Sequence, residues 1–170
     1  MKLVDKEYKD NIVYDAYYLI SLFNRDKEKV TQLQVQKIMY FFEAYYMCIK
    51  NVDKLYDCNF NAWAFGPVSI PLYQDLKKFG DKNIILNDEQ LETANKIDSE
   101  KKKILDYIYT VFGKISAMKL VELTHRKDSP WYSKWMENNE MVVYGEKSYI
   151  SKKQTREWFE RVFLNGNKEN

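Results

Sequence analysis

The chain has 170 residues, of which 45% are hydrophobic and 16% aromatic, so a disordered chain is excluded and one compact domain over residues 1–170 is expected. Its 27 basic and 25 acidic residues give a net charge of +2 and are interspersed, without the basic stripe typical of nucleic-acid-binding proteins. No apolar run approaches the roughly 20 residues that a membrane-spanning helix needs, and no signal peptide is evident, so we expect a cytoplasmic protein that does not contact membranes.

Two helices are predicted in the first part of the chain. Residues 1–10 form a charged leader and residues 165–170 a polar tail, and both ends are expected to be flexible. Apolar residues recur at helical spacing over residues 12–23, before a charged turn. The second helix begins after Thr31, which forms a predicted capping box with Gln34. Because its apolar residues continue for several turns, we expect this helix to be central to the fold.

A strand, a corner and a helix follow in the middle of the chain. Residues 60–65 alternate with a period of two and include aromatic side chains, which predicts a short strand. Gly66 and Pro67 should break this strand, since glycine permits positive φ angles and proline lacks a hydrogen-bond donor. Ser69 is the candidate N-cap of a helix that should end at Gly80.

The next region predicts one longer helix and two weaker elements. Residues 84–86 are apolar and could form either a strand or an extended loop, and residues 88–97 predict a short helix. Ser99 is the candidate N-cap of a longer helix that Gly113 should end. The lysine run 101–103 in its first turn is expected to be a solvated face.

The last third of the chain predicts short helices and a hairpin. Ser116 and Ser129 are candidate N-caps of two helices, the first of which ends at His125. Residues 141–150 flank a glycine-containing turn and predict a β-hairpin, and Ser151 is the candidate N-cap of a final helix. Together the elements predict a mainly α fold (α+β), a single compact helical domain with a small antiparallel β-sheet.

Residues that could support catalysis or bind a metal are few. Cys48, Cys58 and the single histidine, His125, fit no metal-ligand spacing, so we expect no metal or other cofactor and reduced thiols. Asp128 and Ser129 lie near His125, but no nucleophile elbow accompanies them. A histidine near a helix C-terminus can interact with the helix dipole, and we therefore predict no catalytic residue and no enzymatic activity.

A motif set brackets most of the chain and comprises Lys37, Tyr40, Trp63, Gly66, Pro67, Val68, Tyr73, His125, Pro130 and Trp131. This set resembles the Panacea, or SocA-like, antitoxin domain and spans about residues 30–160. The resemblance implies an antitoxin that neutralises a cognate toxin protein by direct binding. In some members of the family it implies an adaptor that delivers the toxin to a cellular protease. The motif residues themselves are expected to be mostly structural.

Candidate contacts with the toxin are large aromatic and arginine side chains near helix ends. Trp63 is expected to lie in the core, since aromatic residues at strand spacing usually do. Trp131 and Tyr132 lie beside polar residues at a helix start and are expected to be partly exposed. With Arg126 and Arg156 they are the predicted partner-binding residues. Homo-oligomerisation is left open.

An alternative hypothesis is a nucleic-acid-binding regulator that uses residues 141–164. The predicted hairpin and the helix after it, with Lys152, Lys153 and Arg156, could act as a wing and a helix. Three glutamates among these basic residues weaken the positive field, so this alternative ranks below the antitoxin and nucleic acid is not an expected partner.

Overall fold

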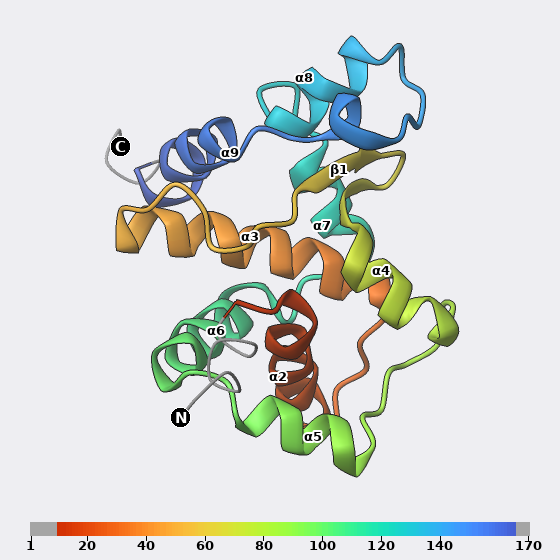
Figure 1. Ribbon diagram of the computed structural model, residues 1–170, viewed down its shortest axis with the longest axis vertical. Coiled ribbons are helices and arrows are strands. Elements are labelled where there is room, and N and C mark those ends of the chain that lie inside the picture. Colours follow the sequence, from red (N-terminus) through yellow and green to blue (C-terminus); the bar gives the residue numbers. More distant parts are fainter. Residues whose placement is uncertain (1–9, 166–170) are drawn as a thin grey trace.

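Helix α3 (Gln32–Lys50) is the centre of the protein in the computed structural model, which describes residues 10–165 (Figure 1). It contacts elements from most of the chain: α2 (Ile12–Arg25), strand β2 (Gly66–Ser69), α4 (Ile70–Leu76), α6 (Ser99–Phe112), α7 (Ala117–Thr124) and α9 (Lys152–Phe159). Every residue from Val35 to Ala44 is buried, as expected of a helix that is packed on all sides. The predicted central position of this helix is confirmed. Predictions for residues 1–9 and 166–170 lie outside the described residues.

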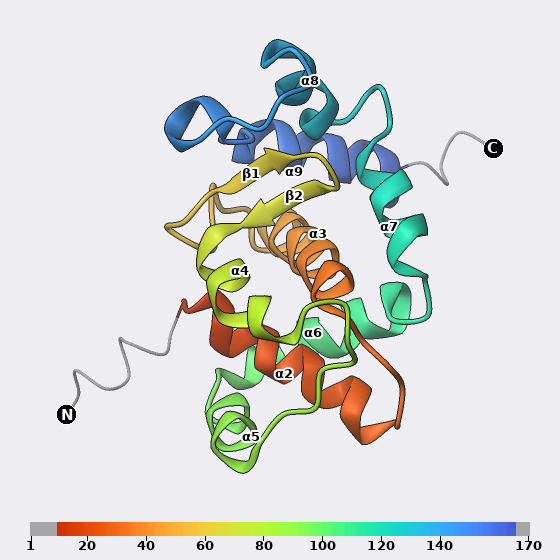
Figure 2. The same ribbon diagram turned by 90° about the vertical axis from the view of Figure 1, so that its right-hand side faces the viewer.

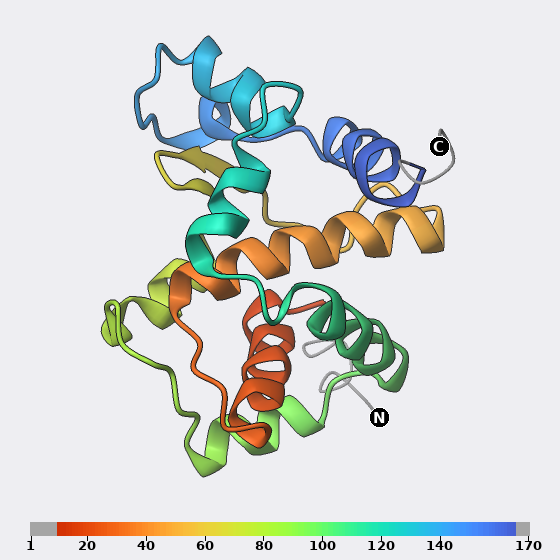
Figure 3. The same cartoon turned by 180° about the vertical axis from the view of Figure 1, so that it is seen from behind.

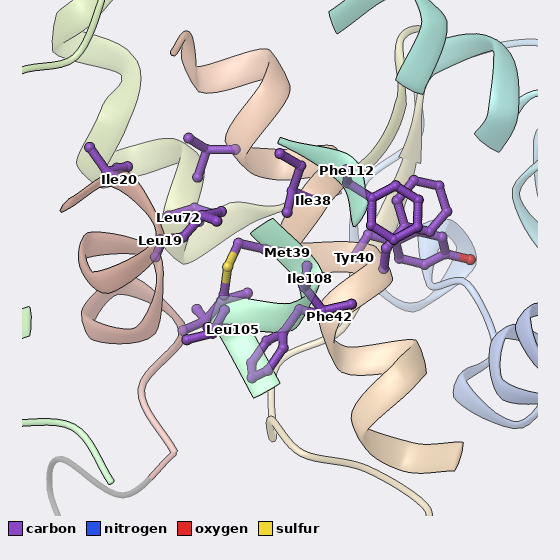
Figure 4. Close-up of a cluster of buried hydrophobic side chains, with 14 of the residues drawn as sticks. Leu19, Ile20, Ile38, Met39, Tyr40, Phe42, Leu72, Leu105, Ile108 and Phe112 are labelled. Atoms are coloured by element: carbon purple, nitrogen blue, oxygen red, sulfur yellow. The ribbon is translucent and has the colours of Figure 1, made fainter. Parts of the chain in front are cut away.

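Two groups of apolar side chains hold α3 to its neighbours. The first joins α3 to α2, α4 and α6 and includes Leu19, Ile20, Ile38, Met39, Phe42, Leu72, Leu105 and Ile108 (Figure 4). The second is aromatic, and in it Phe41 stacks on Phe112 at 4.7 Å and contacts the rings of Trp158, Phe159 and Phe163. Because each large apolar side chain contributes about 1.5–3 kcal/mol on burial, these contacts are a main source of stability.

The remaining elements lie on two sides of α3 (Figures 1 and 3). One side carries α2, α5 (Asp88–Asn95) and α6, and the other carries the sheet, α8 (Pro130–Glu137) and α9. Helix α7 leads from the α6 side to the α8 side. Shorter segments complete the described chain: η1 (Lys77–Phe79), η2 (Gly145–Ser148) and the π-helical turn η3 (Glu160–Leu164). The predicted mainly α fold with a small antiparallel sheet is confirmed.

The sheet is a hairpin of β1 (Phe60–Trp63) and β2, in which Phe60 pairs with Ser69 and Trp63 with Gly66. The predicted strand over residues 60–65 is therefore right for its first four residues and too long by two. Gly66 and Pro67, expected to break the strand, instead begin the second strand. The two intervening residues form the turn, and proline is tolerated because β2 is an edge strand of a two-stranded sheet.

Most predicted helix starts are confirmed. The hydroxyl groups of Ser69, Ser116, Ser129 and Ser151 all accept a hydrogen bond from a first-turn backbone N–H. Thr31 occupies the N-cap position of α3, but its side chain makes no capping hydrogen bond. The Gln34 amide, expected to complete a capping box, instead donates to the Ile115 carbonyl at 3.1 Å. Helix α6 begins one residue earlier than predicted, because Asp98 rather than Ser99 is its cap.

Residues 141–150, predicted to be a hairpin, form an irregular loop that contains the short helix η2. The chain turns just before this segment, where Asn139 and Glu140 have φ angles of 59° and 60°. The extended end of the segment pairs with β1 instead of with itself, since the Ile150 N–H donates to the Phe60 carbonyl at 2.9 Å. The hairpin prediction was therefore wrong. Residues 84–86, left open between a strand and a loop, are a loop.

The lysine run 101–103 is not a uniformly solvated face, because Lys101 is only 3% exposed. Its Nζ lies 3.0 Å from Oδ2 of the buried Asp15, and the Tyr56 hydroxyl donates to the same oxygen at 2.6 Å. This cluster joins α2, α6 and the loop after α3. Burial raises the pKa of Asp15 to about 6, against the opposing effect of the Lys101 charge.

Candidate partner-binding site

Lys37 lies on α3 directly under the hairpin and is completely buried. Its Nζ donates to the Pro67 carbonyl at 2.9 Å. Within the described residues no carboxylate forms an ion pair with it, and burial lowers the pKa of this ammonium from 10.5 to about 7. A buried ammonium without an acidic partner is costly, so it marks this region as a candidate functional site.

The spacing of Lys37, Gly66 and Pro67 in the motif set has a geometric explanation. The Gly66 backbone has a φ angle of 104° and lies against the lysine side chain. A Cβ at this position would be 2.7 Å from Lys37 Cε and 2.7 Å from Thr124 Oγ1. Glycine is thus required both by the backbone conformation and by the close approach of the hairpin to α3 and α7.

A second side chain of α3 holds the other end of β2. The Gln36 amide donates to the Ser69 carbonyl at 2.9 Å and accepts from the Ser69 N–H at 2.9 Å, so it acts like a neighbouring strand. Both contacts are buried, and together with Lys37 they cover the outer edge of β2. Sequence reasoning missed Gln36, although a polar residue next to Lys37 inside an otherwise apolar helix is a signal that could have found it.

His125 and Trp131 contact the hairpin on the β1 side, whereas Lys37 and Gln36 contact β2. Their rings stack with centroids 3.7 Å apart, and the Trp131 Nε1–H donates to the Trp63 carbonyl at 2.8 Å. Pro130 opens α8 after the Ser129 cap and places the Trp131 ring. The expectation that Trp131 is partly exposed was wrong, because this residue is only 3% exposed.

The residues of a possible catalytic triad are near one another in sequence, but the fold does not assemble them into a triad. The Asp128 carboxylate binds the Arg126 side chain at 3.1 Å and accepts from the Trp158 indole, while the Ser129 hydroxyl donates to the Thr124 carbonyl at 2.7 Å. Burial, with the nearby Lys37 charge, lowers the pKa of His125. The arrangement is that of a stacked histidine at the C-cap of α7.

A hollow of about 460 Å³ opens between the start of α3, the hairpin turn and α4, the three elements that Figure 2 places side by side. Its walls are mainly apolar and include Leu33, Trp63, Phe65, Val68, Tyr73 and Val142, with Lys37 among the lining residues. The Trp63 ring meets Tyr73 edge-on at 5.2 Å, and its buried indole N–H has no hydrogen-bond partner within residues 10–165. Trp63 is half-buried rather than fully in the core, and Phe65 is 60% exposed.

The other predicted residues occupy separate places. Tyr40 is buried, and its hydroxyl lies 2.9 Å from Thr155 Oγ1, which joins α3 to α9. Tyr132 is half-buried in α8, and Arg126 is exposed and paired with Asp128. Arg156 donates to the Val52 carbonyl at 3.1 Å and binds Asn51. The two arginines thus contact different parts of the chain.

Over residues 10–165, no helix is long and apolar enough to cross a membrane. The same part of the chain holds no group of three or more histidine, cysteine, aspartate or glutamate side chains that could bind a metal.

The comparison with protein families covers the region that contains the hairpin and most of the hollow. The family described as "Antitoxin SocA-like, Panacea domain" matches residues 35–132, from the first turns of α3 to the start of α8. This is more than half of the chain, and it includes all ten motif residues together with Gln36.

Among curated proteins, Antitoxin SocA of Caulobacter vibrioides (strain NA1000 / CB15N) is 27% identical over 113 residues. The matched segment is 60% of this chain and 58% of that protein, so the chain spans somewhat over half the length of this relative. No solved structure matches the chain. By its match over residues 35–132, the chain belongs to the SocA-like Panacea antitoxin domain family.

Proposed function

We propose that the protein is an antitoxin that neutralises a cognate toxin protein by binding it directly. The observation that carries the proposal is the family match over the elements that build the hairpin and the hollow. The relative with 27% identity is itself named an antitoxin.

The placement of the motif residues supports action by binding rather than by catalysis. Lys37, Gly66 and Pro67 fix the hairpin on α3, and His125 and Trp131 support it from the end of α7 and the start of α8. None of these contacts assembles a nucleophile with a base. What the motif presents to solvent is an apolar hollow with an exposed aromatic residue on its rim.

The toxin is proposed to bind at the hollow and its rim, with Phe65 as an anchoring contact. Exposed aromatic side chains next to a pocket are the usual energetic centres of protein interfaces. Arg126 and Tyr132 are proposed as further contacts outside the hollow. A stable complex should bury roughly 1,200–2,000 Å² in total.

The test is co-expression with the product of the adjacent gene in a growth assay. The unmodified chain should restore growth and co-purify with the toxin, whereas Phe65→Ser should weaken both effects. Ile85→Ser is the matched control, because Ile85 is 64% exposed but does not line the hollow. Loss of rescue in the control but not in Phe65→Ser would contradict the proposed surface, and absence of any complex would contradict direct binding.

Delivery to a protease is a second step that the same complex could serve. Direct inhibition leaves the toxin at constant abundance, whereas delivery lowers it in a protease-dependent manner. Measuring toxin abundance with and without the antitoxin, in cells that have and lack the main cellular proteases, separates the two routes.

Nucleic-acid binding loses the structural basis that the sequence indicated for it. The predicted hairpin is a loop, and two of the three basic residues contact other parts of the chain. Lys152 binds Glu43 at 2.6 Å, and Arg156 binds the loop after α3. No observation favours this alternative over the antitoxin.

A further inference from the structure

We infer that the hollow beside the hairpin binds a segment of the toxin in which an apolar anchor residue is flanked by aspartate or glutamate. The anchor enters the hollow, and the flanking carboxylates face four lysines at one end of it. These lysines, Lys29, Lys77, Lys78 and Lys82, are called the lysine rim. The inference rests on the proposed function, since the toxin is the protein that would supply this segment, and it names the chemistry of the segment.

The hollow itself is suited to an apolar side chain. Its volume of about 460 Å³ is in the range of cavities that bind ligands, and Leu33, Val68 and Tyr73 are among the residues that line it. Two polar groups in its walls are closed to a ligand, because the Lys37 ammonium already donates to a backbone carbonyl of β2 and the Trp63 indole N–H is buried. An apolar side chain that enters the hollow displaces water from both surfaces, so this contact supplies affinity.

The toxin segment cannot bind by adding a strand to the hairpin, since other parts of this chain occupy both edges. On β2, the Gln36 amide donates to the Ser69 carbonyl and accepts from the Ser69 N–H, each at 2.9 Å. On β1, the Ile150 N–H donates to the Phe60 carbonyl at 2.9 Å. Recognition at the hollow therefore depends on the side chains of the bound segment rather than on backbone pairing.

The lysine rim lies where two segments of the chain meet at one end of the hollow. Residues 29–32 and 80–84 are held together by the Ile84 N–H, which donates to the Val30 carbonyl at 2.9 Å. Both segments contribute residues to the walls of the hollow. Each lysine of the rim lies within three residues of one of these lining positions. Because a lysine side chain is long and flexible, its ammonium can reach a carboxylate beside the bound anchor.

The lysine rim carries positive charge that the fold does not use in ion pairs. All four lysines are exposed, and none of them forms an ion pair within residues 10–165. Two acidic residues, Glu28 and Asp81, lie among them in the sequence, so the lysines are in excess. An excess of one charge at the edge of an apolar surface favours a partner with the opposite charge.

The opposite side of the hollow has an excess of the other sign. Val142, in the loop after α8, lines the hollow, and Glu140 and Glu146 of this loop are exposed. They outnumber the one basic residue of the loop, Lys147. The loop lies above the hairpin in Figure 1, whereas α4, which leads into the lysine rim, lies below it. Carboxylates of the bound segment are therefore favoured on the α4 side and repelled on the loop side.

The test uses the full chain and four probe peptides with an amidated C-terminus. The acidic probe is acetyl-Glu-Glu-Gly-Leu-Phe-amide. Glutamine replaces both glutamates in the neutral probe, lysine replaces them in the basic probe, and serine replaces leucine and phenylalanine in the anchor-free probe. Calorimetry at low salt should rank the acidic probe above the neutral and the neutral above the basic. The acidic probe should bind about three- to tenfold more tightly than the neutral one, as expected for two exposed ion pairs.

Two further measurements on the same peptides separate the apolar from the charged contribution. The anchor-free probe should not bind at about 1 mM, and about 1 M salt should abolish the preference for the acidic probe, since the Debye length is then about 3 Å. Equal or tighter binding of the basic probe at low salt would overturn the inference. So would a preference that salt leaves unchanged, an anchor-free probe that binds as tightly as the acidic one, or no binding of the acidic probe at about 1 mM.

Charge reversal tests whether the lysine rim causes the preference. Lys78→Glu combined with Lys82→Glu should bind the basic probe more tightly than the acidic one, with little change in melting temperature because both side chains are exposed. Lys103→Glu combined with Lys153→Glu is the matched control. These two lysines are also exposed but lie on α6 and α9 and do not line the hollow. The control should keep the preference for the acidic probe, and an equal loss in both double variants would contradict the lysine rim.

Lys29→Glu combined with Lys77→Glu repeats the test on the other half of the rim. It should also shift the preference towards the basic probe, so the prediction does not depend on the folding of one variant. If this pair and the first both fold and both keep the preference for the acidic probe, the lysine rim is wrong.

The toxin itself separates this inference from the proposed function. If it binds the unmodified chain and the Lys78→Glu, Lys82→Glu variant equally well at low salt, the inferred acidic segment is wrong and the antitoxin proposal stands. If the probes bind as expected but the toxin forms no complex, the hollow still recognises an acidic segment with an apolar anchor, and direct neutralisation is wrong.

Discussion

Two lysines are buried in the part of the chain that the structure describes, and their surroundings differ. Lys101 lies on the α6 side of α3 and pairs with Asp15 at 3.0 Å, in a cluster that the Tyr56 hydroxyl completes. Lys37 lies on the hairpin side and has the Pro67 carbonyl at 2.9 Å, without an acidic partner among the described residues. The first charge is neutralised inside the fold and joins three segments. The second has no such partner in the described chain, and burial lowers its pKa to about 7 instead.

The largest expected effect is the difference in stability between a variant that lacks Lys101 and one that lacks Lys37. Lys101→Met leaves the Asp15 carboxylate buried without its partner and should destabilise the protein by about 3–5 kcal/mol. Lys37→Met removes a buried ammonium that no carboxylate of the described chain balances, but it leaves the Pro67 carbonyl without its donor, so the two effects oppose each other and the net change in stability should be small. Urea unfolding of both variants measures the difference. Equal losses would show that the two lysines have the same role.

The second effect concerns the close contact between Lys37 and the hairpin. Gly66→Ala should cost about 2–4 kcal/mol, because the new Cβ adds overpacking against Lys37 and Thr124 to the strain of a positive φ angle. Gly80→Ala is the control, since Gly80 has a φ angle of 57° and no described atom lies within 4 Å of the position that its Cβ would take, so backbone strain acts alone. If Gly80→Ala destabilised the protein as much as Gly66→Ala does, backbone strain alone would explain both losses, and the contact with Lys37 would not contribute.

The pH dependence of stability should have opposite signs at the two sites. The pKa of Lys37 falls to about 7 on folding, so its favourable contribution is present above pH 10.5 and is lost as the pH falls towards 7. The pKa of Asp15 rises to about 6, so its contribution is present below pH 3.8 and is lost as the pH rises through 6. Each slope is at most about 1.4 kcal/mol per pH unit.

Substituting each residue in turn shows which group causes which pH dependence of stability. Lys37→Met should remove the rise in stability between pH 7 and 10.5 and leave the fall between pH 3.8 and 6 unchanged, and Asp15→Asn should do the reverse. Chemical unfolding at a series of pH values provides the measurement. An unchanged alkaline slope in Lys37→Met would assign that slope to other groups.

A smaller effect is expected at His125, on the hairpin side. His125→Ala removes the stack on Trp131 and should cost about 1 kcal/mol, in the range of one aromatic pair. Because we propose binding rather than catalysis, toxin neutralisation should persist at temperatures where the variant is folded. Complete loss of neutralisation by a folded His125→Ala protein would indicate a chemical role for the imidazole.

The smallest effect is expected for DNA binding. Affinity for duplex DNA should be weak and should vanish near physiological salt, since basic and acidic residues are interspersed and Lys152 and Arg156 already bind other parts of the chain. A salt series in a fluorescence anisotropy assay tests this. Sequence-selective nanomolar binding would contradict our ranking of the two hypotheses.

Local sequence signals predicted the parts of this fold that depend on neighbouring residues. Serine N-caps and the apolar spacing of α3 identified most helices, because a cap and its first turn lie within three residues. Strand β2 was missed because it is fixed by Gln36 and Lys37, which precede it by about thirty residues. The hairpin at 141–150 was predicted wrongly because its end pairs with β1.

The candidate site was predictable only in part. The motif identified Lys37, Gly66 and Pro67, since their spacing resembles that of a known family, but spacing does not show that the lysine lacks an acidic partner. Burial of Trp131 and exposure of Phe65 depend on how α8 and the hairpin meet. The hollow itself is formed by segments from α3 to the loop after α8, so no local pattern could indicate it.

Titration of purified toxin with the purified chain tests the central claim most directly. Toxin activity should fall linearly to zero at a fixed stoichiometric ratio, and light scattering should detect a complex of that composition. Neutralisation at substoichiometric amounts of the chain, without a detectable complex, would contradict an antitoxin that acts by binding.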